Sequence, residues 1–350
     1  MRIAITYNAD THLKPHLNDI ERLGEDEVAE SARDVYAALS GNHQCALLPV
    51  GDCITAGLQA IRDFAPDLVF NLCEGVLGRT RWEAHFVLAL DLLGIPYCGC
   101  DAVTIALCQD KGFIKQFLRQ IGVATPPGLA LAPGCPEDQA RRDIAALLAG
   151  TDRVIVKPAR EDGGIGVDAE SVVRDPEAAL ARVRAVWASY QQPALVEAFI
   201  DGAEYNLALY HAGGGGLVAL PPGQIVFASG LTPEQRVVGW KAKWDVGSRE
   251  DLATESRVAR NLDPALHADL LQTCTRAAMM LGMTGYCRFD LRQGPDGRIY
   301  VIDVNANPDI GPGSGFRKAL AAADVPFTSF LEQLIAARLS ARNEPWRSAA

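Results

Sequence analysis

The chain has 350 residues, of which 49% are hydrophobic and 22% are charged, a composition typical of a globular protein with more than one domain. Its 33 basic and 43 acidic residues give a net charge of −10, which argues against a nucleic-acid-binding protein because such proteins usually carry a basic face. No run of about 18 uncharged apolar residues is present, so we expect no membrane-spanning helix and no membrane partner.

Two further features favour the cytoplasm. Met1 is followed directly by the strand-like segment 2–7, which leaves no room for a signal peptide. The nine cysteines are odd in number, and the close pair Cys98 and Cys100 lacks the second pair that a zinc site needs. We therefore expect free thiols in a reducing compartment. Because the chain is acidic overall, any anionic ligand must bind at a local cluster of cations.

The first 110 residues alternate strand and helix patterns. The expected order is strand 3–7, helix 27–40, strands 45–50 and 67–72, and helix 82–93. This alternation predicts a parallel sheet flanked by helices. Ligands in such sheets bind beyond the carboxyl ends of the strands, so we expect the segment 71–81, which follows the third strand, to lie on a functional rim.

Two further segments follow this N-terminal domain, which we place at 1–109. The second, at 110–193, has an expected helix at 112–121, a strand at 153–157, a glycine-rich loop at 163–166 and a helix that Asp175 and Pro176 begin. The third, at 194–340, has an apolar strand at 194–200, a hairpin of 204–210 with 217–220, a helix that begins at Asp263-Pro264, and a hairpin of 285–292 with 298–304. The hairpins predict an antiparallel sheet in this third segment, and residues 341–350 are expected to form a flexible tail.

The last hairpin carries the sharpest chemical signal. Because side chains alternate along a strand, Arg288 and Asp290 share one face of its first strand. Asp303 and Asn305 likewise share one face of the second strand, and a tight turn brings the two faces together. Oxygen ligands of this kind suit Mg²⁺. The alternative is that both aspartates are solvated or turn-forming, but they lie between apolar residues where unpaired charge is costly, so we favour a metal site.

Two weaker signals precede this hairpin. The strand at 154–158 delivers Lys157 to a loop with Gly163 and Gly164, whose backbone N–H groups could close over phosphate oxygens. Alone, a glycine-rich loop is more often a simple turn, and this one is not a Walker A motif. The apolar strand at 194–200 contains Glu197, and Glu204 follows it. These two glutamates could hold adenine and ribose, or could be surface residues without a role in binding. Together with a magnesium site on the last hairpin, both patterns indicate a triphosphate site.

In this order, the motifs resemble those of the ATP-grasp superfamily and, within it, D-alanine–D-alanine ligases. Shared segments include 93–99 (Leu-Gly-Ile-Pro-Tyr-Cys-Gly) and Asp110-Lys111, and the resemblance covers most of 1–335. It implies a three-domain ATP-grasp fold, α/β with α+β later domains, in which the nucleotide lies between the central and C-terminal domains. It also implies an ADP-producing carboxylate–amine ligase that uses ATP and two Mg²⁺ ions, with Mn²⁺ as a substitute, and that forms an amide through an acyl phosphate.

The resemblance also implies which residues form the nucleotide and metal sites. Nucleotide contacts would come from Lys111, Lys157, Gly163, Gly164, Glu197, Glu204 and Lys243. Within this set, Glu197 would contact adenine, Glu204 the ribose and Lys243 the γ-phosphate. The metal ligands would be Asp290, Asp303 and Asn305. Four basic side chains and two Mg²⁺ ions would make the cleft positive despite the acidic chain.

The remaining implied roles concern the substrates. Arg288 would stabilise the oxyanion of the tetrahedral intermediate, a suitable role for a fixed planar cation. Glu25 would bind the ammonium group of the first substrate, and Ser314 the carboxylate of the second. Trp244 stands where the family has a substrate-contacting tyrosine after the mobile-loop lysine.

This chain departs from the family mainly at substrate contacts. The stretch 162–164 replaces a serine pair, Trp244 replaces the tyrosine, and 308–315 replaces the family's stretch after the last metal ligand. The middle metal ligand, Asp303, is a glutamate in the family. Because the nucleotide contacts persist, we interpret the chain as a ligase for small amino-acid-like substrates that is distinct from D-alanine–D-alanine ligase.

Two alternatives stay open. One is a genuine D-alanine–D-alanine ligase with a divergent pocket. The other is a catalytically lapsed ATP-binding regulatory protein, which Asp303 and the lost serines would favour. A dehydrogenase is disfavoured because no Gly-x-Gly-x-x-Gly turn follows the first strand. The expected partners are small-molecule carboxylates and amines, and because the family is commonly dimeric, a homodimer is among the expectations.

Overall fold

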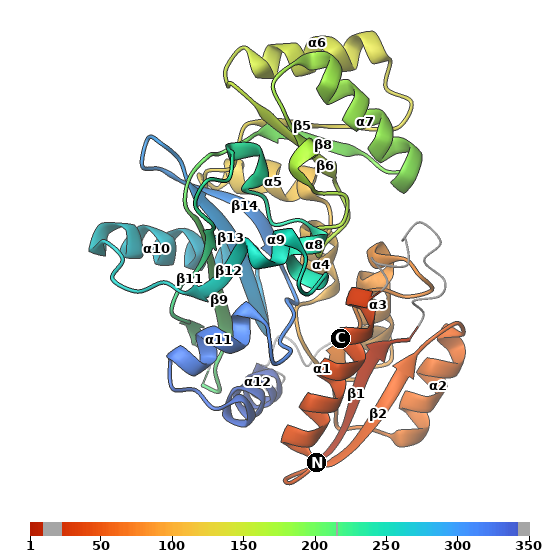
Figure 1. Cartoon of the computed structure of the whole chain (residues 1–350). Helices are drawn as coiled ribbons and strands as arrows, with labels where there is room; N and C mark the ends of the chain where they lie inside the picture. The colour runs from red at the N-terminus through yellow and green to blue at the C-terminus, as the bar shows by residue number, and fades with distance from the viewer. Residues whose placement is uncertain (10–22, 215, 342–350) are drawn as a thin grey trace.

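The protein is described by a computed structural model that covers residues 1–9, 23–214 and 216–341. Within these residues, three sheets organise the fold. In Figure 1 the N-terminal sheet lies at the lower right, the largest sheet runs through the middle, and the third sheet lies at the top beneath two helices. Among the described residues, no helix combines the length and the apolar character that crossing a membrane would require.

The N-terminal sheet is parallel, as the alternating pattern predicted. Its strands run in the order β2-β1-β3-β4, and helices connect them. The elements are β1 (Arg2–Asn8), α1 (Leu23–Leu39), β2 (Gln44–Val50), α2 (Ile54–Phe64), β3 (Leu68–Leu72), α3 (Glu83–Leu92), β4 (Tyr97–Cys98) and α4 (Ala102–Cys108). All five residues of β3 are buried, as expected for a strand with helices on both faces.

The central sheet is antiparallel, in the order β5-β8-β6-β7. Its segment contains α5 (Lys111–Gln120), β5 (Gly128–Leu131), α6 (Glu137–Leu148), β6 (Val154–Pro158), β7 (Val172–Val173), α7 (Pro176–Tyr190) and β8 (Ala194–Ala198). We expected the strand at 194 to open the third segment, and this placement is wrong. β8 hydrogen-bonds to β5 and β6, so it completes the central sheet, and strand pairing of this long-range kind is not encoded in a local pattern.

The largest sheet is also antiparallel, as the hairpins predicted, in the order β12-β11-β9-β13-β14 with β10 paired to β9. Its elements are β9 (Glu204–His211), β10 (Leu217–Ala219), β11 (Gly223–Phe227), α8 (Trp240–Trp244), α9 (Arg249–Leu252), β12 (Thr254–Val258), α10 (Pro264–Met280), β13 (Tyr286–Gln293), β14 (Ile299–Asn305), α11 (Gly315–Ala322) and α12 (Phe327–Ala341). The register places Asp290 opposite Asp303 and Arg288 opposite Asn305, and it shifts by a bulge directly after Asp290. The expected tail lies almost wholly outside the described residues.

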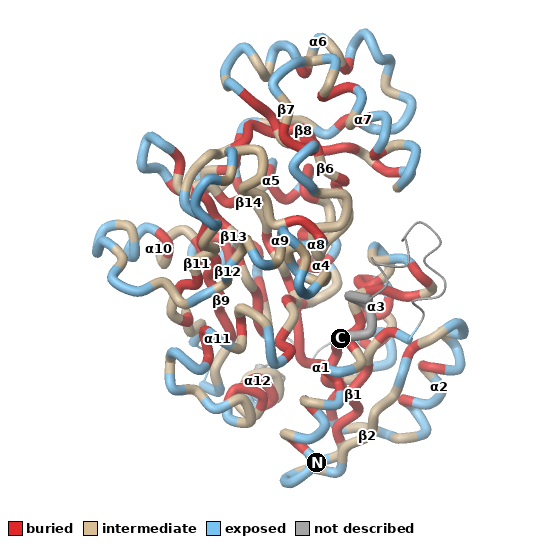
Figure 2. The backbone as a smooth tube through the Cα atoms, viewed as in Figure 1, coloured by how far each residue is buried: buried red, intermediate tan, exposed pale blue. Residues whose placement is uncertain are grey.

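The hydrophobic cores show which sheets belong together. One core joins α1 and β3 to α12, where Val35, Phe70 and Phe330 are fully buried with Tyr286 of β13. A second core also joins the N-terminal sheet to the largest sheet. The third core is confined to the central sheet and to α6 and α7, which cover one of its faces (Figures 1 and 2). The opposite face of the central sheet is therefore free to form one wall of a cleft.

Candidate active site

A cavity of about 700 Å³ lies between the central and largest sheets. Every candidate residue whose side chain the structure describes lines this cavity. The predicted rim at 71–81 contributes Glu74 and Thr80. The exception is Glu25, which lies in α1 but whose side chain is outside the described set.

The proposed metal ligands converge at one end of the β13–β14 hairpin. Both oxygens of Asp290 accept hydrogen bonds from Arg288, at 2.8 and 2.9 Å, and Asn305 Nδ2 lies 3.4 Å from Asp290 Oδ2. Asp303 Oδ1 pairs with Lys111 Nζ at 3.1 Å. Two carboxylates and an amide oxygen on adjacent strands form a donor set that fits Mg²⁺.

Lys111 occupies the start of α5 because Asp110 caps that helix, accepting from the backbone N–H groups of its first turn. The Lys111 ammonium bridges Asp303 and, at 2.7 Å, Asp162 of the glycine-rich loop. Burial alone would raise the pKa of Asp303, but the surrounding lysines, Lys111 foremost, hold that pKa well below its usual range. Asp303 is therefore an anion at neutral pH and can serve as a metal ligand.

A buried charged triad holds Lys157 in place. The carboxylate of Glu197, only 2% exposed, pairs with Lys157 Nζ at 2.9 Å and with the buried Lys115 ammonium. Burial lowers the pKa of Lys115 to about 8, although Glu197 opposes this. Lys115 was not among the sequence candidates, although its spacing of four residues from Lys111 on one helix was an available signal.

Glu204, the predicted ribose ligand, also has a buried partner that the sequence analysis missed. Arg292 directly faces Glu204 across the β9–β13 pair, and its Nε donates to Glu204 Oε2 at 2.9 Å. The Arg292 guanidinium lies 4.8 Å from the ring centre of Phe199 and donates to the carbonyl of Ile200. An acidic group, a cation and an aromatic ring therefore meet at this end of the cavity.

The segment 231–248, which we call the covering segment, closes over the glycine-rich loop. Trp244 Nε1 donates to the carbonyl oxygen of Gly163 at 3.0 Å. Gly164 has a φ of +83°, and a Cβ there would lie 2.7 Å from the carbonyl carbon of Gly239. Glycine is thus needed at 164 for both its conformation and the close approach of two backbones.

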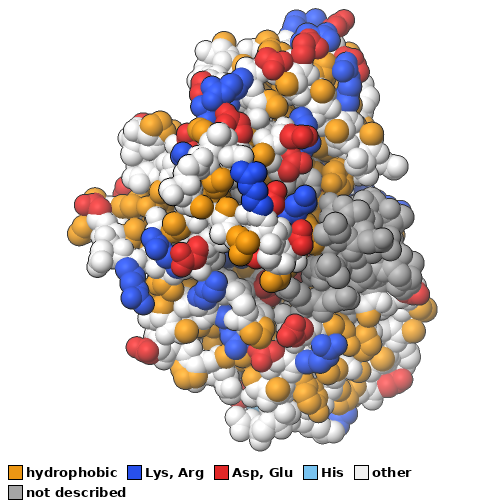
Figure 3. Space-filling view, viewed as in Figure 1, with side chains coloured by type: hydrophobic (Ala, Val, Ile, Leu, Met, Phe, Trp, Pro, Cys, Tyr) orange, Lys and Arg blue, Asp and Glu red, His pale blue; other side chains and the backbone are white. Residues whose placement is uncertain are grey.

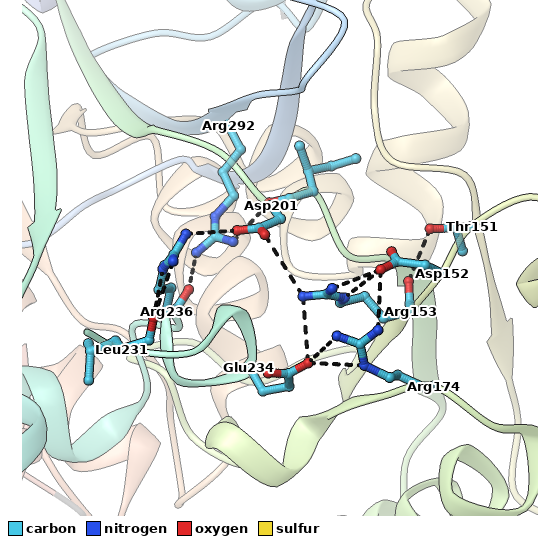
Figure 4. Close-up of polar contacts among 10 residues, drawn as sticks. Thr151, Asp152, Arg153, Arg174, Asp201, Leu231, Glu234, Arg236 and Arg292 are labelled. Atoms are coloured by element: carbon cyan, nitrogen blue, oxygen red, sulfur yellow. Dashed lines mark hydrogen bonds and ion pairs between the residues drawn. The ribbon is translucent and has the colours of Figure 1, made fainter. Parts of the chain in front are cut away.

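Ion pairs fasten the start of the covering segment to its surroundings (Figure 4). Arg174 Nη2 donates to Glu234 Oε1 at 2.9 Å, and Arg153 Nη1 lies 3.5 Å from the same oxygen. Arg236 Nη1 pairs with Asp201 at 3.3 Å, in the connection between β8 and β9. The covering segment is therefore held at two places, by this cluster and by the Trp244–Gly163 hydrogen bond.

Two further predicted residues, Lys243 and Ser314, also line the cavity. Loss of solvation within the cleft, and then the charge of Arg288, lower the pKa of Lys243. Ser314 caps α11, accepting from Arg317 N at 3.2 Å, and still lines the cavity. The structure thus brings both predicted residues to the same cavity as the nucleotide candidates.

The side chains that line the cavity do not by themselves carry a net positive charge. The described lining contains more carboxylates than cations. On the face shown in Figure 3, the described acidic and basic side chains are interspersed. A triphosphate would be repelled by this lining unless divalent cations offset the carboxylates, which agrees with the donor set of the hairpin.

Residues 119–336 match the family model for the D-ala D-ala ligase C-terminus. The chain belongs to this family. As a D-Ala–D-Ala ligase family member, it is an ATP-grasp enzyme, an ATP-dependent ligase that forms a C–N bond.

Individual relatives are distant. D-alanine–D-alanine ligase B of Pseudomonas putida is 27% identical over 295 residues, which cover 84% of this chain and 83% of the relative. An uncharacterized protein of Sinorhizobium fredii is 28% identical over 268 residues, 77% of this chain and 73% of that protein. The D-alanine–D-alanine ligase from Bacillus anthracis, solved as a complex with ATP, has a TM-score of 0.75 at 20% identity and covers 98% of both chains. The ATP-grasp fold expected from the sequence is therefore confirmed.

Proposed function

We propose that this member of the D-Ala–D-Ala ligase family joins two small amino-acid-like substrates through an acyl phosphate, and that its substrates are not a pair of D-alanines. The observation that carries the proposal is a contrast between two sets of residues that line the cavity. Lys111, Lys157 and the carboxylates of the β13–β14 hairpin line the cavity together, which supports their proposed roles as nucleotide and metal contacts. In contrast, the stretch 162–164 and Trp244 stand where the resemblance implies a serine pair and a tyrosine around the first substrate, and they have no hydroxyl groups.

The chemistry would proceed in two steps. A substrate carboxylate oxygen attacks the γ-phosphorus of ATP, which forms the acyl phosphate and releases ADP. The second substrate's amine then attacks the acyl carbon, and phosphate leaves. Lys111, Lys157 and Lys243 would hold the phosphates so that two anions can approach, a problem of positioning and charge neutralisation.

The hairpin would contribute at both steps. Asp290, Asp303 and Asn305 would hold Mg²⁺, which offsets the charge of the phosphate oxygens when bound. We retain two ions as the expectation, with Mn²⁺ as a substitute. Arg288, whose plane is fixed by two hydrogen bonds to Asp290, would stabilise the oxyanion that forms on the acyl carbon. Glu25 would bind the first substrate's ammonium group and Ser314 the second substrate's carboxylate.

ADP release with a panel of substrate pairs tests the proposal. The panel contains D-alanine alone, glycine, and the common L-amino acids in pairs, with ATP and Mg²⁺. We expect stimulated ADP release with a particular pair and an amide product by mass spectrometry. Efficient turnover of D-alanine alone would instead show a genuine D-alanine–D-alanine ligase, and ATP binding without phosphate release from any pair would show a lapsed enzyme. A homodimer stays a prediction.

A further inference from the structure

Glu83, the first residue of α3, lines the same cavity and has no role in the scheme above. The residue is only 9% exposed. Asn307 Nδ2 donates to Oε1 at 3.0 Å, and Gln109 Nε2 donates to Oε2 at 2.9 Å. Two neutral amides, from segments far apart in the chain, therefore fix the position of this carboxylate.

Glu83 differs in its partners from three other carboxylates that line the cavity. Glu197, Glu204 and Asp303 each face a lysine or an arginine. Within the described part of the chain, no lysine or arginine nitrogen lies within ion-pair distance of Glu83. A carboxylate in this setting is costly to keep charged, so it has a real affinity for a proton.

The pKa of Glu83 reflects this environment. Burial raises it most, the charge of Asp162 also raises it, and the hydrogen bonds from Asn307 and Gln109 lower it, so that the pKa of Glu83 is about 7. Asp162 is itself paired with Lys111, and the titratable thiol of Cys108, on α4, has its own pKa raised well above the usual value by burial. A proton acceptor near pH 7 is the kind that general base catalysis requires.

The position of Glu83 connects it to the second half of the reaction. Its partner Asn307 follows the hairpin end at Asn305 and precedes Ser314, where we place the second substrate. Its other partner, Gln109, precedes the phosphate-binding candidate Lys111. Glu83 thus lies beside the chain segments that border both the phosphate end and the acceptor end of the cavity.

We propose that Glu83 accepts the proton that the attacking ammonium group must lose before the amide bond forms. The inference rests on the proposed function. An ammonium nitrogen has no free electron pair, so one proton passes to the Glu83 carboxylate and yields the amine. The amine nitrogen forms the C–N bond as the bond from the acyl carbon to the phosphate oxygen breaks. The leaving phosphate takes a second proton from nitrogen, and the Glu83 carboxylic acid releases its proton to solvent.

The test compares two nucleophiles with Glu83→Gln. Hydroxylamine is uncharged at neutral pH and needs no base, so it traps the acyl phosphate as a hydroxamate without help from Glu83. The amine of the best substrate pair from the panel is protonated at this pH. We expect the variant to keep hydroxamate formation at the wild-type rate and to lose amide formation by about 10²- to 10⁴-fold at pH 7. The acidic limb of the pH profile for the amine should disappear with it.

Controls separate this proposal from a structural role and from the proposed function. Equal loss of both products in Glu83→Gln would show that the residue only supports the fold, and retention of both would show that it is not the base. Glu83→Asp keeps a carboxylate and should restore part of the amide activity with a pH-dependent limb. If the wild-type protein formed neither ADP nor hydroxamate with any carboxylate of the panel, the proposed function itself would be wrong, and this inference with it.

Discussion

The unusual environment of Glu83 predicts a pH dependence of stability that needs no substrate. Its pKa is about 7 in the folded protein, because burial disfavours the anion, against an ordinary value of 4.5. Between these values the folded protein binds more protons at this site than the unfolded chain does. The stabilisation by protonated Glu83 is therefore complete below pH 4.5 and lost as the pH rises through about 7. At about 1.4 kcal/mol per pH unit, this interval corresponds to about 3 kcal/mol.

The measurement is the free energy of unfolding by urea for wild type and Glu83→Gln, in EDTA, at intervals between about pH 4.5 and 8. The glutamine cannot ionise, so the wild-type value minus the variant value isolates the titration of Glu83. This difference should fall by about 3 kcal/mol across the range. Calorimetry at each pH checks whether unfolding occurs as one transition.

A difference that stays flat across this pH range would refute the reasoning, because Glu83 would then have the same pKa in the folded and unfolded states. Glu170→Gln is the matched control. The Glu170 side chain is 87% exposed, so its substitution should leave the pH dependence of the wild-type protein unchanged.

Three further predictions concern the nucleotide end of the cavity. Gly164→Ala should raise the KM for ATP at least about tenfold, because the new Cβ would clash with the Gly239 backbone. The control is Gly134→Ala, at a φ of +86° with no atom within 4 Å of the new Cβ, which should leave the KM for ATP unchanged. Lys115→Met should weaken ATP binding about tenfold by calorimetry, because Glu197 would then pair with Lys157 alone and compete with the phosphates for that lysine. An unchanged Kd would contradict the positioning role of Lys115. Arg288→Ala should lower kcat by about 10²- to 10³-fold while ATP binding survives, and a normal kcat would exclude the oxyanion role.

The parts of the site that the sequence predicted are those governed by local rules. Strand alternation and a tight turn were enough to place Asp290, Asp303 and Asn305 together, and the structure confirms that they converge. Lys157 is likewise carried by a strand whose alternate side chains face the cavity. The roles of these residues in binding ATP and metal stay predictions.

The parts that were missed depend on contacts between distant segments. The sheet that β8 joins is set by pairing with β5 and β6, which no feature of its own sequence specifies. The Glu204–Arg292 pair follows from the β9–β13 register. Glu83 is defined by Asn307, which lies 224 residues away in the chain, so its isolation from cations could not be read from its neighbours in sequence.

The separate core of the central sheet has a mechanical consequence. Two cores join the N-terminal sheet to the largest sheet, whereas α6 and α7 pack only on the central sheet. We therefore expect the central sheet with α6 and α7, which we call the central unit, to rotate as a rigid body relative to the rest of the protein. The covering segment belongs to the connection between β11 and β12 but is bound to the central unit through Glu234 and Trp244. The covering segment therefore links the central unit to the largest sheet. We expect the cleft to widen at the same time as the contacts of this segment with the central unit break.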